Sequence, residues 1–416
     1  MPIPRLNIAN KYFCWALILF PVAVMYSFFG IPLSYVITAI GMLLAVISGR
    51  TLLLRGASWV IVFFCYMAVI PSLVFFLSTH ALGGLIQTGT WLFLLYMMLF
   101  NEYVERTYLR RVYGWVLIAA ICFFLYQEFI YLLTDSRISG IIPFLDFTYY
   151  ADSSTEAFSE VQQNANRSSS FFLEPAMFAQ FLVPGLAMNM KYTRKNFLCF
   201  LGLLIIIVIG RTGTGLFIGA IASVIYLLNW EEGSKAVKFT FYCVIFIVGL
   251  IGARYIMTTN YYTYISARTE EFSSDDSSAF VRFFRGYLLL GAMTPAEKLL
   301  GVGTKNLVEI TQRPGVSAFF GDNDIYMNGV QAVLVGGGVV GLALFFWMLW
   351  KIYRQADSTG RYIILLFSIQ SLMAASYLSA LMLVDLIFAL KYKRTCLSKS
   401  ILTQRMSMMP RHSTLP

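Results

Sequence analysis

The sequence predicts an all-α polytopic membrane protein with about 11–12 transmembrane helices and two long hydrophilic loops on one side of the membrane. The chain has 416 residues, of which 58% are hydrophobic and 12% are charged, whereas a soluble domain carries about 25% charged residues. The mean hydropathy is +0.71. Many apolar runs approach about 20 residues, the length of helix that crosses a bilayer. We expect the whole chain, 1–416, to be one integral membrane domain.

Each predicted span is an apolar run bounded by polar or charged residues. The last run, 361–390, would form a single helix of about 45 Å, longer than the hydrocarbon core of about 30 Å. It is therefore either one tilted helix or two short helices broken near Ala374–Ser379, and the basic tail after it favours two. The other spans are expected at about 12–29, 31–48, 57–78, 82–100, 112–133, 170–190, 196–210, 211–229, 236–256 and 326–350.

Loop charge predicts the orientation of these spans. The short connections near Gly30 and His80 carry no Lys or Arg, whereas the alternate connections are basic, so the N-terminus and the tail, 391–416, are expected in the cytoplasm. The two long hydrophilic segments, 134–169 and 254–325, then both lie outside. The inner loops hold Arg50, Arg55, Arg106, Arg110, Arg111, Lys191, Arg194, Lys195, Lys235, Lys238, Lys351, Arg354 and Arg361.

Composition and residue counts exclude several other classes of protein. The net charge of +10 does not indicate nucleic-acid binding, because the basic residues lie mostly in short loops where they set topology. The six cysteines form no C-x-x-C pattern and none lies in a long segment, so neither a zinc site nor a disulfide framework is expected. Two histidines, His80 and His412, are too few for a His-based metal site, and no cofactor is expected. The first apolar run, Tyr12–Phe29, lacks a cleavage site, which favours a span over a signal peptide.

Arginines on the outer side are the first candidates for chemistry. Arg211 opens Arg-Thr-Gly-Thr-Gly at the outer start of a span, where it is either a snorkelling anchor or a residue that function requires. Arg282 and Arg285 lie three apart within the apolar stretch Ala279–Met293, so a helix would place both guanidinium groups on one face. Because a guanidinium binds phosphate in a bidentate manner, these residues predict an anionic, lipid-anchored substrate.

Polar groups at the starts of two later spans are further candidates. Arg167 and Glu174 flank Ser-Ser-Ser-Phe-Phe-Leu, and Glu174-Pro175 fits a helix start. The alternative for Glu174 is a carboxylate at the rim of a cavity, where it orients an arginine or accepts a proton. The second group precedes and opens the span at 326–350, and helix capping explains one member but not all. Its members are Asp322, Asn323, Asp324 and Asn328.

Two carboxylates and a glycine motif lie inside apolar segments. Glu128 and Asp385 are functional candidates because charge is costly in hydrocarbon, although both lie near predicted segment ends. The run Gly336–Gly341 matches G-x-G-x-x-G, but it has no preceding strand and sits within a span. Close helix–helix packing is its expected role.

Four features together resemble the bacterial O-antigen polymerases, which are integral membrane glycosyltransferases that join lipid-linked oligosaccharide repeats. In the related O-antigen ligases a histidine often precedes the asparagine of the last feature, whereas this chain has Asp322. That difference disfavours a ligase and leaves no histidine as general base in the second long segment. The four features are Arg167–Phe178 (RSSSFFLEPAMF), Arg211-Thr212-Gly213, Gly301-Val302-Gly303, and Asp322-Asn323 followed by Tyr326 and the glycines of 336–341.

The resemblance implies a GT-C-like enzyme of the bacterial inner membrane whose active site faces the periplasm. Donor and acceptor would both be glycans linked to undecaprenyl pyrophosphate, and an acceptor hydroxyl would attack the anomeric carbon of the donor while undecaprenyl pyrophosphate leaves. Expected partners are membrane lipids and a chain-length regulator. We expect catalytic roles for Arg211, Arg282, Arg285, Glu174, Asp322 and Asp324, and substrate binding by Arg167, Arg254, Asn323, Asn328 and Tyr326.

Three alternatives remain open. An O-antigen ligase differs from a polymerase only in its acceptor. A flippase or other transporter of lipid-linked glycans should carry charge within its spans and show internal repeats with paired broken helices, and neither is evident. A structural scaffold for polysaccharide export is the third, and the clustered outer arginines argue weakly against it.

Overall fold

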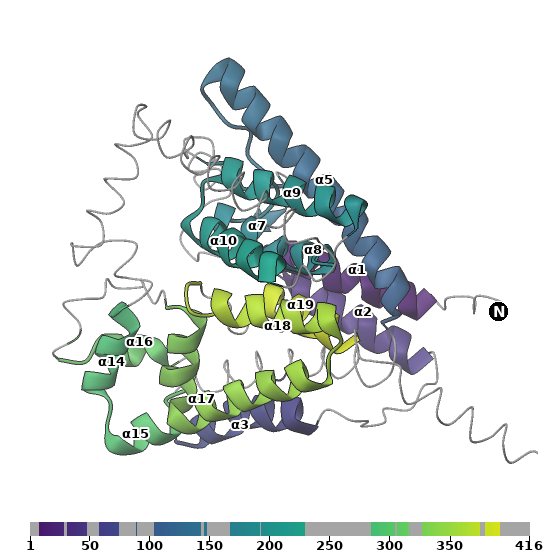
Figure 1. Ribbon diagram of the computed structural model, residues 1–416. Coiled ribbons are helices and arrows are strands. Elements are labelled where there is room, and N and C mark those ends of the chain that lie inside the picture. The colour runs from purple at the N-terminus through teal and green to yellow at the C-terminus, as the bar shows by residue number, and fades with distance from the viewer. Residues whose placement is uncertain are drawn as a thin grey trace, which may run out of the picture.

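A computed structural model shows an all-α fold with three very short strands (Figure 1). The described residues are 8–28, 31–47, 58–74, 89, 104–142, 145–147, 167–191, 193–228, 284–303, 306–314, 316, 327–374 and 379–391. The predicted span 236–256 lies outside them, as does 82–100 apart from Gly89.

The elements that precede the second long segment extend from Ile8 to Leu228. Glu105 caps α5 by accepting hydrogen bonds from the backbone N–H groups of Thr107 and Tyr108, so this helix starts six residues before the apolar run itself. The elements are α1 (Ile8–Ala23), β1 (Tyr26–Phe28), β2 (Ile31–Pro32), α2 (Leu33–Ile47), α3 (Ser58–Val74), α5 (Arg106–Thr134), β3 (Asp146–Phe147), α7 (Pro175–Phe181), α8 (Val183–Met188), α9 (Arg194–Gly210) and α10 (Gly213–Leu228).

The remaining helices follow the second long segment. The apolar run 361–390 forms two helices, as the basic tail favoured, with the first ending at Gln370 and the second starting at Ala380. The elements are α14 (Gly286–Ala292), α15 (Pro295–Leu300), α16 (Leu307–Thr311), α17 (Gly329–Gln355), α18 (Ser358–Gln370) and α19 (Ala380–Lys391).

Within the described part, two helices are long and apolar enough to cross a membrane. They are α5, with 29 residues, and α17, with 27 residues. Several other helices leave large apolar side chains exposed, such as Val46 (78% exposed) on α2 and Val208 (58% exposed) on α9. Exposed apolar faces of this extent mark surfaces that contact lipid or protein.

The predicted span 170–190 departs from a single helix. Residues 167–174 form turns, and the following helix is interrupted at Leu182 between α7 and α8. Pro184 explains the interruption, since proline has no N–H to donate to the carbonyl of Gln180. The hydroxyl of Tyr113 on α5 bridges the gap: it donates to the carbonyl of Phe181 at 2.7 Å and accepts from the N–H of Gly185 at 2.9 Å.

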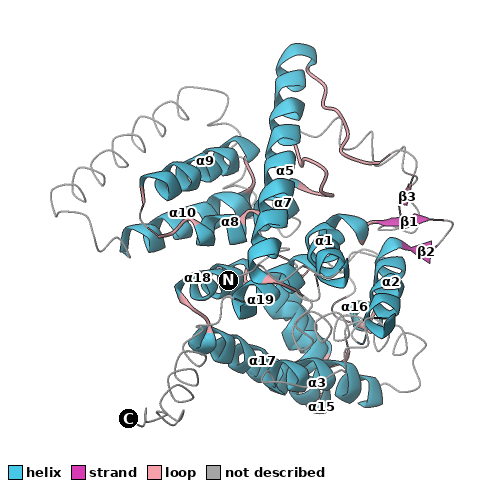
Figure 2. Cartoon of the chain, turned by 90° about the vertical axis from the view of Figure 1, so that its right-hand side faces the viewer, coloured by secondary structure: helices cyan, strands magenta, loops and turns pink. Residues whose placement is uncertain are grey.

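Helix α19 lies at the centre of the core. It contacts α1, α7, α8, α17 and α18, and all its side chains from Ala380 to Ala389 are buried. Around it, α17 lies beside both α18 and α3, an arrangement visible in both views (Figures 1 and 2).

Contacts between distant segments define two ends of the helix bundle. At the end where the two long segments attach, called here the loop end, β1 pairs with β2 and β3 (Figure 2). The N–H of Gly329 also donates to the carbonyl of Ala374 there. At the opposite end, Arg106 pairs with Asp357 at 3.2 Å and joins the starts of α5 and α18.

A small helical module, formed by α14, α15 and α16, packs on the first half of α17 (Figure 1). Its inner ion pair joins Arg313 and Glu297 through two hydrogen bonds of 2.8 Å each. Glu297 also completes a capping box with Thr294 at the start of α15. The module shares a separate apolar core with α17, made of Leu289, Met293, Val302, Ile310, Val316, Met327 and Val335.

Candidate functional site

Arg211 lies at the loop end, in the turn that joins α9 to α10. Arg211 follows the last residue of α9 and has a left-handed backbone with φ of 51°. It is half-buried. Thr212 then starts α10, because its hydroxyl accepts a hydrogen bond from the N–H of Gly215 at 2.9 Å. A left-handed arginine costs free energy relative to glycine, so a glycine would fit this turn better.

The turn at Arg211 lies next to the helix that follows the Arg167–Glu174 segment. Helix α10 contacts α7, and a Cβ atom added to Gly215 would lie 2.9 Å from the Cβ atom of Ala179. Small residues on both helices permit this close approach. The structure thus brings Arg211 to the same end of the bundle as Arg167 and Glu174.

The segment from Arg167 to Ser170 is fixed against the end of α5. The amide of Gln127 accepts from the N–H of Ser170 at 2.8 Å and donates to the carbonyl of Ser170 at 3.3 Å and to that of Ile138 at 2.8 Å. The Ser170 hydroxyl donates to the carbonyl of Ala120 at 2.8 Å. Ser170 is wholly buried and has a positive φ of 57°.

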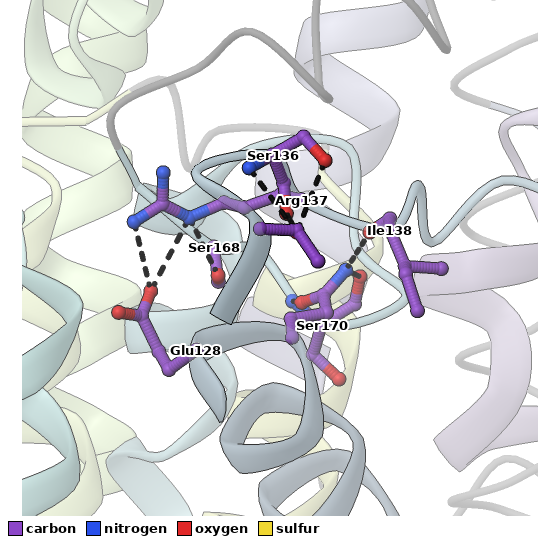
Figure 3. Close-up of polar contacts among 8 residues, drawn as sticks. Glu128, Ser136, Arg137, Ile138, Ser168 and Ser170 are labelled. Atoms are coloured by element: carbon purple, nitrogen blue, oxygen red, sulfur yellow. Dashed lines mark hydrogen bonds and ion pairs between the residues drawn. The ribbon is translucent and has the colours of Figure 1, made fainter. Parts of the chain in front are cut away.

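The Arg137–Glu128 ion pair is buried, and Arg137 also holds Ser168, two residues before Ser170 in this segment. The guanidinium of Arg137 lies 3.4 Å from the carboxylate of Glu128 and donates from Nε to the hydroxyl of Ser168 at 3.0 Å (Figure 3). The carbon at the centre of the guanidinium lies 3.5 Å from the centre of the Tyr131 ring. Glu128 was a candidate for a functional carboxylate, and in the described part of the chain it pairs with Arg137.

Backbone strain is concentrated at the loop end. In the described part of the chain, the non-glycine residues with positive φ are Asp135, Ser170 and Arg211. Asp135 ends α5, and the other two lie in the segments described above. Strained backbone of this kind clusters at functional sites, where surrounding contacts hold it in place.

Glu174 occupies the position predicted from Glu174-Pro175. It is the residue before α7, with Pro175 in the first turn, but its carboxylate makes no capping hydrogen bond. The residue is half-buried at the loop end. Glu174 therefore precedes a helix, as predicted, but its carboxylate does not cap that helix. The alternative role, a carboxylate at the rim of a cavity, stays a prediction.

Gln331 lies against both Asn328 and Gly286, the residue after Arg285. Asn328 caps α17, because its side chain accepts from the N–H of Gln331 at 2.8 Å, while the Gln331 amide oxygen accepts from the N–H of Asn328 at 3.2 Å. The residue after Arg285 is Gly286, and a Cβ atom there would lie 2.7 Å from the Gln331 amide oxygen. Arg285 is 5% exposed, at the start of α14.

Asp385 lies in the middle of α19, whereas the sequence placed it near a segment end. It is 1% exposed, and one carboxylate oxygen has no hydrogen-bond partner among the residues that the structure describes. The described residues also contain no group of three or more His, Cys, Asp or Glu side chains that could hold a metal ion.

The two glycine motifs form one junction. Val302 and Gly303 donate their N–H groups to the carbonyls of Val335 and Gly336 at 3.1 and 2.8 Å. Helix α17 is kinked at Gly338, whose φ is 66°. Close packing of the motif was predicted and is confirmed, since Gly341 also lies against Met67 and Tyr66 of α3. The kink was not predicted.

Six predicted site residues lie outside the described part of the chain. They are Arg254, Arg282, Asp322, Asn323, Asp324 and Tyr326. Arg137 was missed, although a signal existed: a carboxylate such as Glu128 within an apolar segment requires a charged or hydrogen-bonding partner, and Arg137 is the next arginine along the chain.

Chemically, the loop end carries a half-buried arginine on each of two segments and a half-buried carboxylate. Such a set can bind an anionic group through guanidinium hydrogen bonds and accept a proton nearby. No protein-family model matches this chain, and no curated protein matches it either.

Proposed function

We propose that this chain is a polytopic enzyme of the bacterial inner membrane that polymerises glycan repeat units linked to undecaprenyl pyrophosphate. The product would be an O-antigen-type polysaccharide, made on the periplasmic side. The observation that carries the proposal is the placement of Arg167, Glu174 and Arg211 at the same end of the bundle, on segments that pack beside one another. These are residues of two motifs that resemble those of the polymerases.

Leaving-group stabilisation is the main catalytic task in this proposal. When the acceptor hydroxyl attacks the anomeric carbon, the bond to the pyrophosphate oxygen breaks and negative charge develops on that oxygen. Preorganised guanidinium groups stabilise such charge without a metal ion. We assign this role to Arg211 together with Arg285, and to Arg282, which lies outside the described residues. Arg167 would bind the acceptor.

Proton removal from the acceptor hydroxyl falls to a carboxylate in this proposal. Glu174 is half-buried and does not cap its helix, so its oxygens are not committed to the backbone of α7. Asp322 and Asp324 are the other candidates. A general base contributes about 10²–10⁴ in rate, less than the whole acceleration expected of the enzyme.

Membrane insertion is part of the same proposal. The two long apolar helices and the exposed apolar faces of the shorter helices support a polytopic arrangement. The long segments would then lie in the periplasm together with the loop end, where lipid-linked glycans are presented.

Deletion of the gene in its native host tests the proposal directly. We expect the surface glycolipid to show lipid A–core with a single repeat unit, because donor units would still be made, flipped and ligated but not polymerised. Bare core with polymer accumulating on the carrier lipid would indicate a ligase instead. An unchanged ladder of chain lengths would contradict both activities and favour a capsule enzyme or a transporter.

A further inference from the structure

We propose that Arg137 is a positioning residue of the glycan-transfer site, which holds the Arg167–Ser170 segment in the conformation that presents Arg167 and Glu174 to substrate. This inference rests on the proposed function for its catalytic consequence. The positioning itself rests on contacts of Arg137, which lies outside every motif noted in the sequence.

The guanidinium of Arg137 is engaged by partners within the protein. Its residue is 3% exposed, and its guanidinium lies between the carboxylate of Glu128, at 3.4 Å, and the ring of Tyr131. Both partners belong to the last two turns of α5, so the guanidinium is fixed to that helix. A charge held in this way can transmit position to a neighbour.

The neighbour that Arg137 holds is the segment before Glu174. Its Nε group donates to the hydroxyl of Ser168 at 3.0 Å (Figure 3). Two residues later, Gln127 binds both the N–H and the carbonyl of Ser170. One contact holds Ser168 and the other holds Ser170, the residue with the strained backbone, and both come from the last turns of α5 and the residues just after it. Together they determine the direction in which the chain leaves for Glu174.

Stability alone does not explain this ion pair. Both charges are removed from water, and their separation of 3.4 Å is longer than that of a well-formed charge-assisted hydrogen bond. Buried pairs of this kind are often no more stabilising than apolar residues of similar size, whereas they fix one arrangement among several. Burial of Arg137 and Glu128 costs desolvation free energy, and a role in fixing the Arg167–Ser170 segment gives a reason for that burial.

The test compares variants that separate positioning from folding. Arg137→Met alone leaves the Glu128 carboxylate buried without its partner, which destabilises the fold by itself. The double variant Arg137→Met/Glu128→Gln removes both charges. Ser168→Ala removes only the contact to the segment. Arg106→Met is the matched control, because it breaks an ion pair with Asp357 at the opposite end.

Two measurements on purified protein in lipid nanodiscs decide the outcome. Hydrogen exchange of the peptide that contains residues 167–174 reports the segment, and transfer between synthetic lipid-pyrophosphate glycans reports kcat and KM. We expect the double variant to keep the wild-type melting temperature within a few degrees, to exchange at least tenfold faster in that peptide, and to lose at least tenfold in kcat. Ser168→Ala should show smaller changes of the same kind, and Arg106→Met should show neither.

Three results would contradict the inference. Wild-type exchange in the double variant would show that Arg137 does not position the segment. Wild-type kcat with faster exchange would show that the position has no catalytic consequence. A loss of melting temperature in proportion to the loss of kcat would reduce Arg137 to a folding residue. If the wild-type protein itself transfers no glycan, the proposed function fails, and the exchange measurement still decides the positioning role.

Discussion

The backbone N–H of Gly303 donates to the carbonyl oxygen of Gly336 at 2.8 Å, although the two glycines lie in separate motifs of the sequence. In an unbroken helix, this carbonyl would accept from a residue one turn later in α17. The kink at Gly338 removes that donor, and Gly303, in the segment after α15, supplies another. The Tyr66 hydroxyl from α3 lies 3.0 Å from the carbonyls of both Leu300 and Gly337.

Substitution of Gly338 should therefore unfold this junction. A Cβ atom on Gly338 would collide with the carbonyl of Leu299, and φ of 66° is strained for any other residue. We expect Gly338→Ala to lower stability by about 2–5 kcal/mol, measured by thermal unfolding in detergent. Gly202→Ala on α9 is the control, because no heavy atom lies within 4 Å of its added Cβ. Equal stability of the two variants would contradict the kink.

The Tyr113 hydroxyl replaces a helical hydrogen bond between Phe181 and Gly185. Removal of the hydroxyl in Tyr113→Phe leaves a buried carbonyl and a buried N–H without their partner. We expect a loss of about 2–3 kcal/mol in thermal unfolding. Tyr126→Phe on the same helix, where the side chain is 49% exposed, should change stability by less than about 0.5 kcal/mol. A melting temperature that Tyr113→Phe leaves unchanged would show that α7 and α8 do not depend on this bridge.

Helix positions were predictable because apolar run length and loop charge are local properties of the sequence. The runs at 31–48 and 196–210 match α2 and α9 within two residues at each end. The division of 361–390 followed from its length and the basic tail. Glu174 as the residue before a helix followed from the proline after it.

Features that depend on distant partners were not predictable. Pro184 explains the break at Leu182 locally, but the Tyr113 hydroxyl that replaces the lost hydrogen bond comes from α5. The kink at Gly338 is completed by Val302 and Gly303, which follow α15. Arg137 is an ordinary arginine of a hydrophilic segment until the fold places Ser168 beside it. A periodic pattern contains no information about such pairings, because the residues that complete them lie tens of positions away.

Acid should weaken the α14–α16 module through Glu297. The hydrogen bonds from Arg313, followed by those from Thr294, lower the pKa of Glu297 from 4.5 to about 2. Since the folded pKa lies below the unfolded one, this stabilisation is complete above about pH 5 and is lost as the pH falls towards 2. It amounts to about 3 kcal/mol at neutral pH.

Comparison of Glu297→Gln with wild type across pH measures this contribution. We expect the difference in melting temperature to be largest at pH 7 and to shrink between pH 5 and 3. Glu309→Gln is the control, because Glu309 is exposed on α16 and makes no hydrogen bond with Arg313 among the described contacts. A difference that stays constant with pH would show that Glu297 acts through packing and not through its charge.

Asn328 has a structural role as a helix cap and a predicted role in substrate binding, and two substitutions separate them. Asn328→Ala should lower stability by about 1 kcal/mol because it removes the acceptor for the N–H of Gln331. Asn328→Ser supplies a cap oxygen but no amide, so we expect near wild-type stability with less polymer. Wild-type polymer in Asn328→Ser would leave capping as the role of this residue. Thermal unfolding and the chain-length ladder give the two readings.

Arg211 combines a strained backbone with a guanidinium, and glycine separates the two. Arg211→Gly relieves the left-handed backbone at φ of 51°, so we expect stability equal to or up to about 1 kcal/mol above wild type. The same variant should make no polymer, because the group proposed to bind the pyrophosphate is gone. Arg211→Ala should also make none at an unchanged protein level, and Arg211→Lys should make little, since an ammonium lacks the bidentate geometry. Wild-type chain lengths in Arg211→Gly would refute the assignment and leave Arg211 as an anchor at the membrane edge.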